Sequence, residues 1–306
     1  MENNRMTATQ VSIEVLFLGQ IIIGTIGNLS LLGQYVFLYV SGYKPRSSDL
    51  ILRHLTVANT LVILSRGIPE TMAALGVKDF LTDVGCKLIF YVHRVGRGVS
   101  IGSTCLLSVF QVTIIVPRSS RWANIKAKFP KYLEIFITLC WTLNMIVNII
   151  FPVQITAKSK NKNITNEINF EYCSAPSDGK VLRSVNVALF SISDGLCIGL
   201  MLWASGFMVF TLQRHKQQVR HMHRANVSCR TSPVTRATKR ILVLVCLYVK
   251  FYTMSCIIQA CMPIFHNPST LLLTLAALMN IFFPTACPLL LMNWTHTSFC
   301  FCQKEN

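Results

Sequence analysis

Apolar residues gather into long stretches along the 306-residue chain, and shorter polar linkers separate these stretches. A helix needs about 20 predominantly apolar residues to cross roughly 30 Å of hydrocarbon. Seven stretches reach that length, near residues 11–40, 49–75, 86–116, 132–153, 185–213, 241–262 and 270–292. The pattern predicts an all-α membrane protein: a seven-transmembrane helix bundle that forms one domain over 1–306, with no separate soluble domain.

Composition agrees with this prediction. Hydrophobic residues make up 52% of the chain and charged residues only 13%, as is typical of a polytopic membrane protein. The amino-terminal segment leads directly into the first apolar stretch, which is too long for the core of a cleavable signal peptide. We therefore expect the first helix to act as an uncleaved insertion signal.

Lysine and arginine are unevenly distributed between two alternating sets of linkers. The richer set holds 16 of them, in 41–48, 117–131, 214–240 and the tail 293–306. The poorer set holds seven, in 1–10, 76–85, 154–184 and 263–269. Because cytoplasmic loops carry the excess of positive charge, the sequence predicts a multi-pass plasma-membrane protein with its amino terminus outside and its carboxyl terminus inside. The net charge of +17 then reflects topology and contact with anionic membrane lipid, and we predict no nucleic-acid partner.

Two of the twelve cysteines stand at the outer surface. Cys86 opens the third apolar stretch and Cys173 lies in the long second outer loop, both in an oxidising compartment. We expect a disulfide between them, which would tether this loop over the bundle. Seven other cysteines lie within apolar stretches and are expected to be small buried hydrophobic residues: Cys105, Cys140, Cys197, Cys246, Cys256, Cys261 and Cys287.

The same outer loop contains a glycosylation acceptor, Asn163-Ile164-Thr165. The matching motifs at Asn226 and Asn293 fall on the cytoplasmic side, and the one at Asn28 falls inside the first stretch. The topology therefore selects Asn163, with an unused motif as the alternative.

Charged residues inside a bilayer are costly and are functional candidates by default. Arg53 and Lys87 lie near the ends of their stretches, where they can reach water, and need no special role. Seven other ionisable side chains lie deeper, in the outer half of the bundle or, for Lys250, near its middle. They are Arg66, Glu70, His93, Arg94, Arg97, Asp194 and Lys250.

Two explanations fit this set. The first is a group of interhelical ion pairs, such as Asp194 with Arg94 or Arg97, that joins the helices. The second is a water-accessible ligand-binding cavity that uses all seven residues. Basic residues outnumber carboxylates, so an electronegative or acceptor-bearing small molecule would fit such a cavity.

The third stretch and the linker after it carry a resemblance. Residues 93–111 read HRVGRGVSIGSTCLLSVFQ, and residues 117–128 read PRSSRWANIKAK. Together with LTVANTLVILSRGIPETM at 55–72, FEYCS at 170–174 and FYTMSC at 251–256, they resemble the vomeronasal type-1 receptor family, G-protein-coupled receptors for pheromone-like small molecules. The resemblance covers nearly the whole chain. It implies the Cys86–Cys173 bridge, glycosylated Asn163, a ligand cavity among the outer helix halves, and a heterotrimeric G-protein partner of the inhibitory type in sensory neurons.

Several positions depart from the larger rhodopsin-like class. Asn59 stands where an acidic sodium ligand would be expected. The residue directly before Arg118 is a proline, so no acidic neighbour restrains this arginine. The sixth stretch has no interior Trp-x-Pro, and the seventh carries Pro284 and Pro288 without Asn-Pro-x-x-Tyr. Activation must therefore use other contacts. The two prolines should bend the seventh helix, as a fixed kink or as a hinge.

Basic residues also border the cytoplasmic ends of the third and sixth stretches. They contribute to topology and lipid contact, and the resemblance adds contact with the G protein for Arg118, Arg121, Arg236, Lys239 and Arg240. Cys300 and Cys302 are candidate palmitoylation sites, with an unmodified tail as the alternative. The histidines and Cys229 of the third inner loop match no zinc spacing, so we predict no metal site and no cofactor.

Other function classes fit less well. A transporter or channel is disfavoured because the chain shows no internal repeat. An enzyme is disfavoured because no catalytic motif has suitable spacing and context. A bitter-taste receptor is the nearest alternative among receptors, since it too lacks several rhodopsin-like motifs.

Overall fold

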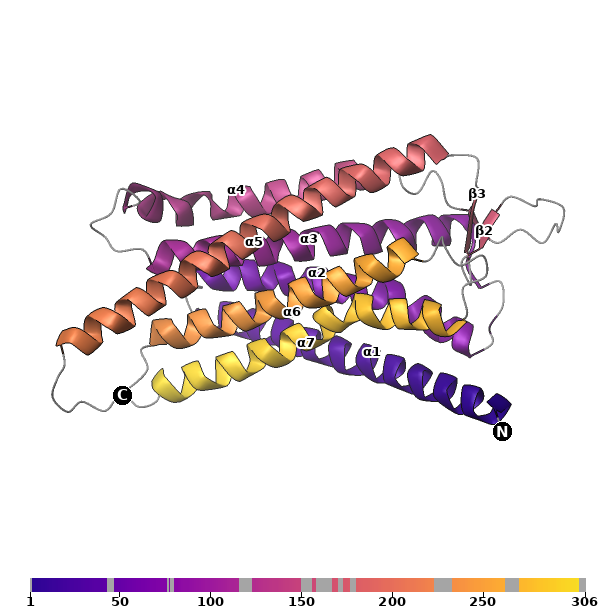
Figure 1. Cartoon of the computed structure of the whole chain (residues 1–306), viewed down its shortest axis with the longest axis horizontal. Coiled ribbons are helices and arrows are strands. Elements are labelled where there is room, and N and C mark those ends of the chain that lie inside the picture. Colours follow the sequence, from indigo (N-terminus) through magenta and orange to yellow (C-terminus); the bar gives the residue numbers. More distant parts are fainter. Residues whose placement is uncertain are drawn as a thin grey trace.

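The computed structural model describes residues 2–42, 47–75, 77, 80–115, 123–149, 156–157, 167–169, 173–176, 180–222, 233–261 and 270–302. This part of the chain contains seven helices: α1 (Glu2–Val40), α2 (Ser47–Ala74), α3 (Asp83–Ile115), α4 (Ala123–Asn148), α5 (Lys180–Met222), α6 (Pro233–Cys261) and α7 (Thr270–Cys302). They run side by side in an elongated bundle (Figure 1). Each predicted apolar stretch coincides over most of its length with one of these helices, so the predicted seven-helix fold is confirmed.

Several helices extend beyond the apolar stretches that predicted them. The fourth begins at Ala123, the fifth continues to Met222 and the seventh to Cys302. The added residues 214–222 and 293–302 contain no proline or glycine, so nothing in them interrupts the helix. Apolarity reports only the part of a helix that lies in hydrocarbon, whereas the helix itself continues into the polar region.

Large apolar side chains cover the outward faces of the bundle. Phe37 of α1, Ile146 of α4, and Leu196 and Phe210 of α5 are between 62% and 71% exposed. Within the described residues, three segments are long and apolar enough to cross a membrane: Val15–Val40, Asp83–Ile115 and Ser191–Arg214. Water would disfavour such continuous apolar faces, whereas hydrocarbon solvates them.

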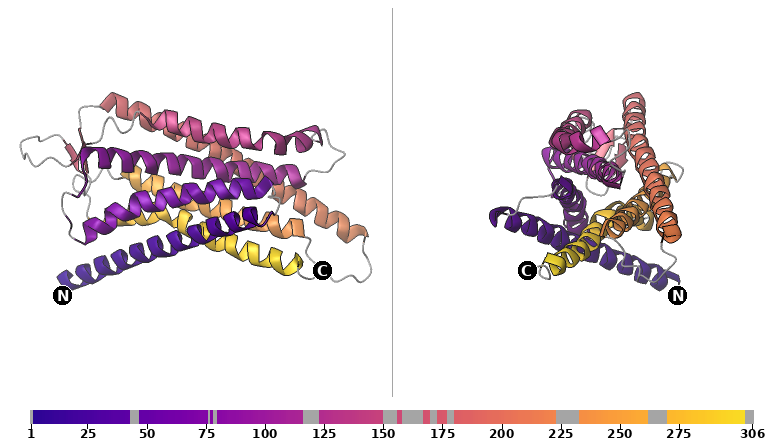
Figure 2. Two further views of the ribbon diagram at one scale, coloured as in Figure 1. Left: turned by 180° about the vertical axis from the view of Figure 1, so that it is seen from behind. Right: turned by 90° about the vertical axis from the view of Figure 1, so that its left-hand side faces the viewer.

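The third helix is the centre of the bundle. It contacts α2, α4, α5 and α6, and the left-hand view of Figure 2 shows it between α4 and α2. The first helix packs against α2 and α7 on the other side. Fully buried side chains from different helices form the core, among them Leu31, Leu55, Leu107, Met201 and Leu244.

Two glycines set the distance between α3 and α4. A Cβ added at Gly98 would overlap Oδ1 of Asn144, and one added at Gly102 would overlap Sγ of Cys140. Small residues four positions apart let membrane helices approach closely. The close contact at these two glycines therefore fixes the distance between α3 and α4.

An amide from α1 compensates for a proline in α7. Pro288 has no N–H, so the carbonyl of Pro284, four residues earlier, loses its helical donor. Asn28 Nδ2 donates to this carbonyl at 3.0 Å and to the carbonyl of Gly24 at 2.7 Å. The contact favours a fixed bend over a free hinge at this point, because the freed carbonyl is already bonded.

A small sheet covers the end of the bundle at which α1 begins (Figure 1). Its strands are β1 (Thr156–Ala157), β2 (Glu167–Asn169) and β3 (Cys173–Pro176), which pair antiparallel in the order β1-β3-β2. A disulfide joins Cys173 of β3 to Cys86 in the first turns of α3. This is the pair expected from the sequence, and it holds the sheet against the central helix.

Candidate functional site

A cavity of about 30 Å³ lies inside the bundle, between α2, α3, α6 and α7. Two residues of the predicted ligand-binding set line it, His93 and Arg97. The other lining residues are uncharged: Val62, Ser100, Tyr248, Phe251, Tyr252, Ser255, Met279, Asn280, Phe283 and Pro284. The cavity is therefore largely aromatic and apolar, with a guanidinium group on one wall.

Contacts from two neighbouring helices hold the Arg97 side chain. Its Nη1 donates to Oδ1 of Asn280 on α7 at 3.2 Å, and its Cζ lies 4.8 Å from the ring centroid of Tyr252 on α6. The same Asn280 oxygen accepts a second hydrogen bond from Ser255 Oγ at 2.7 Å. One amide oxygen thus connects α3, α6 and α7 at the cavity wall.

Asp194 extends this network to α5. The Tyr252 hydroxyl donates a short hydrogen bond to Asp194 Oδ2. Arg94 interacts electrostatically with the same carboxylate and with Arg97. The predicted link between Asp194 and the cations of α3 therefore runs through electrostatic attraction to Arg94 and, for Arg97, through the intervening Tyr252.

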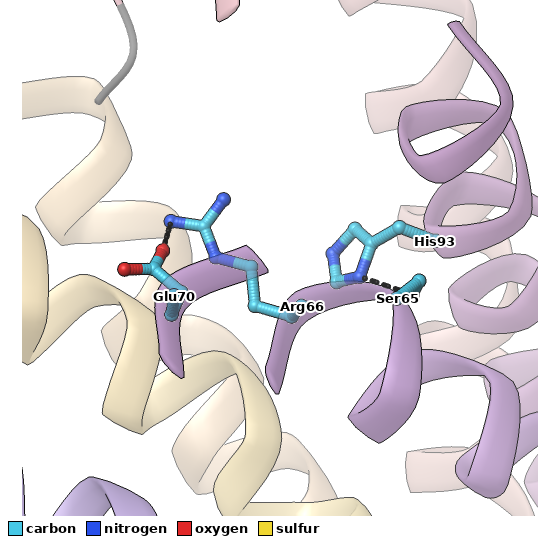
Figure 3. Close-up of polar contacts among 4 residues, drawn as sticks. All are labelled: Ser65, Arg66, Glu70 and His93. Atoms are coloured by element: carbon cyan, nitrogen blue, oxygen red, sulfur yellow. Dashed lines mark hydrogen bonds and ion pairs between the residues drawn. The ribbon is translucent and has the colours of Figure 1, made fainter. Parts of the chain in front are cut away.

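The remaining ionisable pair lies within α2. Arg66 Nη2 and Glu70 Oε1 are 2.9 Å apart, one helical turn from each other, and their side chains are only 22% and 12% exposed. Figure 3 shows this ion pair beside His93, whose Nδ1 lies 3.4 Å from Ser65 Oγ. Glu70 balances one of the positive charges beside the cavity, and Ser65 orients the imidazole that lines it.

The charges of this region sum to an excess of one positive charge. Arg66, Arg94 and Arg97 carry three, whereas Glu70 and Asp194 supply two negative charges. An acceptor or an anion would therefore be attracted to the cavity. Both explanations offered by the sequence stay hypotheses: the charges connect helices, and two of the seven residues, His93 and Arg97, line the cavity.

Five members of the predicted set do not line the cavity: Arg66, Glu70, Arg94, Asp194 and Lys250. Lys250 differs from the other four in lying on the outside of the bundle. Its side chain is exposed, and its Nζ lies 5.9 Å from the Phe251 ring centroid. Tyr248 and Tyr252, two positions away on either side, line the cavity. Because residues two apart on an α-helix are rotated by about 200°, Lys250 faces away from it.

The uncharged cavity residues were not predicted, because an uncharged polar or aromatic side chain costs less in a bilayer than a charged one and so stands out less in the sequence. Tyr248, Tyr252 and Ser255 are spaced by four and three positions and share one face of α6. Tyr248 also packs edge-on against Phe283, with ring centroids 4.5 Å apart. The spacing of these polar and aromatic residues along α6 is the feature of the sequence that could have indicated them.

A buried hydrogen bond closes the inner side of the cavity. Ser100 Oγ donates to Oδ1 of Asn59 at 2.8 Å, and both side chains are buried. Asn59 is the amide at the position where an acidic sodium ligand would be expected. It serves as a neutral hydrogen-bonding partner between α2 and α3.

The predicted modification and G-protein sites are only partly within the described structure. Asn163, Arg118 and Arg121 lie outside the described residues, and the side chains of Arg236, Cys300 and Cys302 are outside them too. At the inner end of α6, Lys239 is exposed and Arg240 is half-buried. Their neighbour Thr238 is fully buried and accepts a hydrogen bond from Gln111 Nε2 of α3 at 3.1 Å.

Comparison with known proteins identifies the family. A model of the vomeronasal organ pheromone receptor family matches residues 11–303. The chain is 48% identical over 287 residues to vomeronasal type-1 receptor 4 of Homo sapiens, across 94% of this chain and 95% of the relative. It is 54% identical over 273 residues to vomeronasal type-1 receptor 2 of Homo sapiens, across 89% and 69%. It is 32% identical over 239 residues to olfactory receptor class A-like protein 1 of Danio rerio, across 78% and 75%. The chain therefore belongs to the vomeronasal organ pheromone receptor family, whose members are multi-pass membrane receptors and not enzymes.

Proposed function

We propose that this chain is a plasma-membrane receptor that binds a pheromone-like small molecule among the outer halves of its helices. Ligand binding then activates a heterotrimeric G protein of the inhibitory type. The observation that carries the proposal is the position of Arg97, a cation on the wall of an otherwise neutral cavity. Its partners belong to α6 and α7, so a ligand that replaces them changes how these helices are joined.

The size of the cavity indicates how a ligand enters it. Ligand pockets in proteins usually measure roughly 300–1,000 Å³, far more than the cavity of about 30 Å³ around Arg97. A ligand must therefore displace side chains such as Tyr252 and Phe251 from their present contacts. A ligand shifts a conformational equilibrium only through contacts that differ between the two states, and this displacement supplies such a difference.

The lining favours one class of ligand. Tyr248, Phe251 and Phe283 offer aromatic surface to an apolar body, while Arg97 donates to an acceptor such as a carbonyl, hydroxyl or acidic oxygen. The acceptor replaces Asn280 Oδ1 as the partner of Arg97. Ser255 keeps its hydrogen bond to Asn280, so α6 and α7 separate from α3 as a pair.

The inhibitory type of G protein rests on the resemblance to the family, with Arg118, Arg121, Arg236, Lys239 and Arg240 as its contacts. Exposed Lys239 and half-buried Arg240 are at the inner end of α6, the helix that carries Tyr252 and Ser255 of the cavity. Movement of α6 at the cavity therefore changes the surface that these cations present.

The test is a screen of pheromone-like small molecules in cells that carry an inhibitory-type G protein, with the wild-type chain and an Arg97→Gln variant. A hydrogen bond to a charged group is worth about 1.5–3 kcal/mol, so Arg97→Gln should raise the half-maximal ligand concentration by about tenfold or more. Lys250→Gln is the matched control, because it removes a cation from the same bundle outside the cavity.

Surface expression must be measured for all three proteins. An Arg97→Gln variant that reaches the surface and responds like the wild type would contradict the ligand site. Equal losses in Arg97→Gln and Lys250→Gln would contradict it too, because the effect would then not be specific to the cavity.

A further inference from the structure

A second cavity lies at the opposite end of the bundle, where α1 ends and α2 begins. Its volume is about 200 Å³, and residues from α1, α2 and α4 line it. We call it the inner cleft. Its polar residues are Tyr35, Tyr39, Asp49, Arg53 and Glu134.

Helical spacing brings these polar groups together. Tyr35 and Tyr39 are four residues apart in the last turns of α1, and Asp49 and Arg53 are four apart in the first turns of α2. Glu134 faces them from α4. With the carboxyl end of the chain inside the cell, this level corresponds to the inner boundary of the bilayer.

The inner cleft opens toward the surroundings of the bundle. Tyr39 is 71% exposed, and the Arg53 and Glu134 side chains are also exposed. Tyr35 and Asp49 are half-buried and form the deeper part. A molecule in the inner leaflet can therefore reach the charged groups directly from the membrane.

The charges of the inner cleft fit a group that carries both signs. Asp49 and Glu134 are acceptors, and a tyrosine hydroxyl adds a third, which matches the three donors of a primary ammonium. The Arg53 guanidinium suits a phosphate, which it binds through paired donors. Apolar Leu38 and Leu50 complete the lining and suit acyl chains.

We infer that the inner cleft binds an inner-leaflet phospholipid whose headgroup carries a primary ammonium beside its phosphate, as phosphatidylethanolamine does. A headgroup with only negative charge would be repelled by two carboxylates and attracted by one guanidinium, so it fits the inner cleft less well. A choline headgroup carries positive charge but has no N–H donor for the carboxylates. The inference is independent of the ligand cavity around Arg97.

The test uses the purified full-length chain and native mass spectrometry. The protein is offered equal amounts of phosphatidylethanolamine, phosphatidylcholine and phosphatidylglycerol with identical acyl chains. Phosphatidylethanolamine should be retained about tenfold more than either of the others, because only its headgroup can donate charge-assisted hydrogen bonds to the carboxylates while its phosphate binds Arg53. Glu134→Gln should remove most of this preference. Asp83→Asn, which neutralises an exposed carboxylate at the outer end of α3, should leave it unchanged.

A second measurement needs no variant. Successive N-methylation of the ethanolamine headgroup removes its donors one at a time, so retention by the wild-type chain should fall stepwise. Equal retention across this series would overturn the inference. So would equal retention of phosphatidylglycerol, or a Glu134→Gln chain that keeps the full preference.

Discussion

At the scale of single residues, the buried amide of Asn28 supplies a donor that Pro288 makes necessary. The Pro284 carbonyl has no helical donor, and a buried carbonyl without a partner is costly in hydrocarbon. Asn28 is 1% exposed and reaches this carbonyl from a different helix. One side-chain hydrogen bond thus joins α1 to α7 where α7 carries its prolines.

We expect Asn28→Leu to lower the free energy of unfolding by about 1–3 kcal/mol, because the Pro284 carbonyl then stays buried without a donor. Thermal unfolding of the detergent-purified chain measures this. Pro288→Ala restores the missing N–H, so Asn28→Leu should cost less in that background. An equal loss of unfolding free energy in both backgrounds would show that Asn28 does not compensate for the N–H that Pro288 lacks.

At the scale of helices, the hydrogen bond between Gln111 and Thr238 joins α3 to α6 near their cytoplasmic ends. Gln111 is 5% exposed and Thr238 is fully buried. The sequence has no acidic residue beside Arg118 that could restrain this region by an ion pair. A neutral hydrogen bond between the two helices provides a restraint of moderate strength.

Thr238→Val removes the hydroxyl and leaves the Gln111 amide buried without that acceptor. The lost hydrogen bond is worth about 1 kcal/mol, so the state in which the inner ends of α3 and α6 are separated should be populated about fivefold more. Ligand-independent signalling should rise by the same factor. A second-messenger assay at matched surface expression measures it. Thr238→Ser keeps the hydroxyl and should behave like the wild type; basal signalling that is equal in all three chains would contradict the role of this bond.

Helices were predictable because a bilayer leaves the backbone no alternative. Every N–H and C=O in hydrocarbon needs an internal partner, so an apolar stretch of sufficient length indicates a helix directly. Helix ends were less predictable, since 214–222 and 293–302 are polar or mixed and still helical. The three short strands gave no signal, because their pairing depends on the position that the Cys86–Cys173 bond gives to β3.

The site was predictable in part. His93 and Arg97 stood out as costly intramembrane groups, and both line the cavity. Lys250 stood out for the same reason but faces away, because depth alone does not give the rotation of a helix about its axis. Asn280 and Ser255 carry no charge, and their role depends on two helices meeting, which no single stretch of sequence shows.

At the scale of the whole molecule, α6 connects the site proposed for the ligand with the surface proposed for the G protein. Tyr252 and Ser255 contact the network around Arg97 near its outer end, and Lys239 and Arg240 lie near its inner end. A helix of this length transmits displacement as a nearly rigid body. Contacts that a ligand makes in the cavity can therefore change the position of the inner end of α6, although the two sites do not touch.

The double variant Lys239→Gln/Arg240→Gln should reach the surface and bind ligand normally but activate the G protein less, by about tenfold if two charged contacts are lost. Ligand-stimulated nucleotide exchange on a purified inhibitory-type G protein measures this. Lys250→Gln, which removes an exposed cation from the same helix away from its cytoplasmic end, is the control. Unchanged exchange in the α6 variant would contradict the proposed contact.

The bond between Cys86 and Cys173 also changes the connectivity of the molecule. It closes the chain from residue 86 to residue 173 into a covalent ring that contains most of α3, all of α4, and strands β1 and β2. Cutting any one peptide bond within that ring leaves its two sides attached through sulfur. A receptor whose outer loops meet extracellular proteases thus keeps its central helix linked to the rest of the chain after a single cut in this segment.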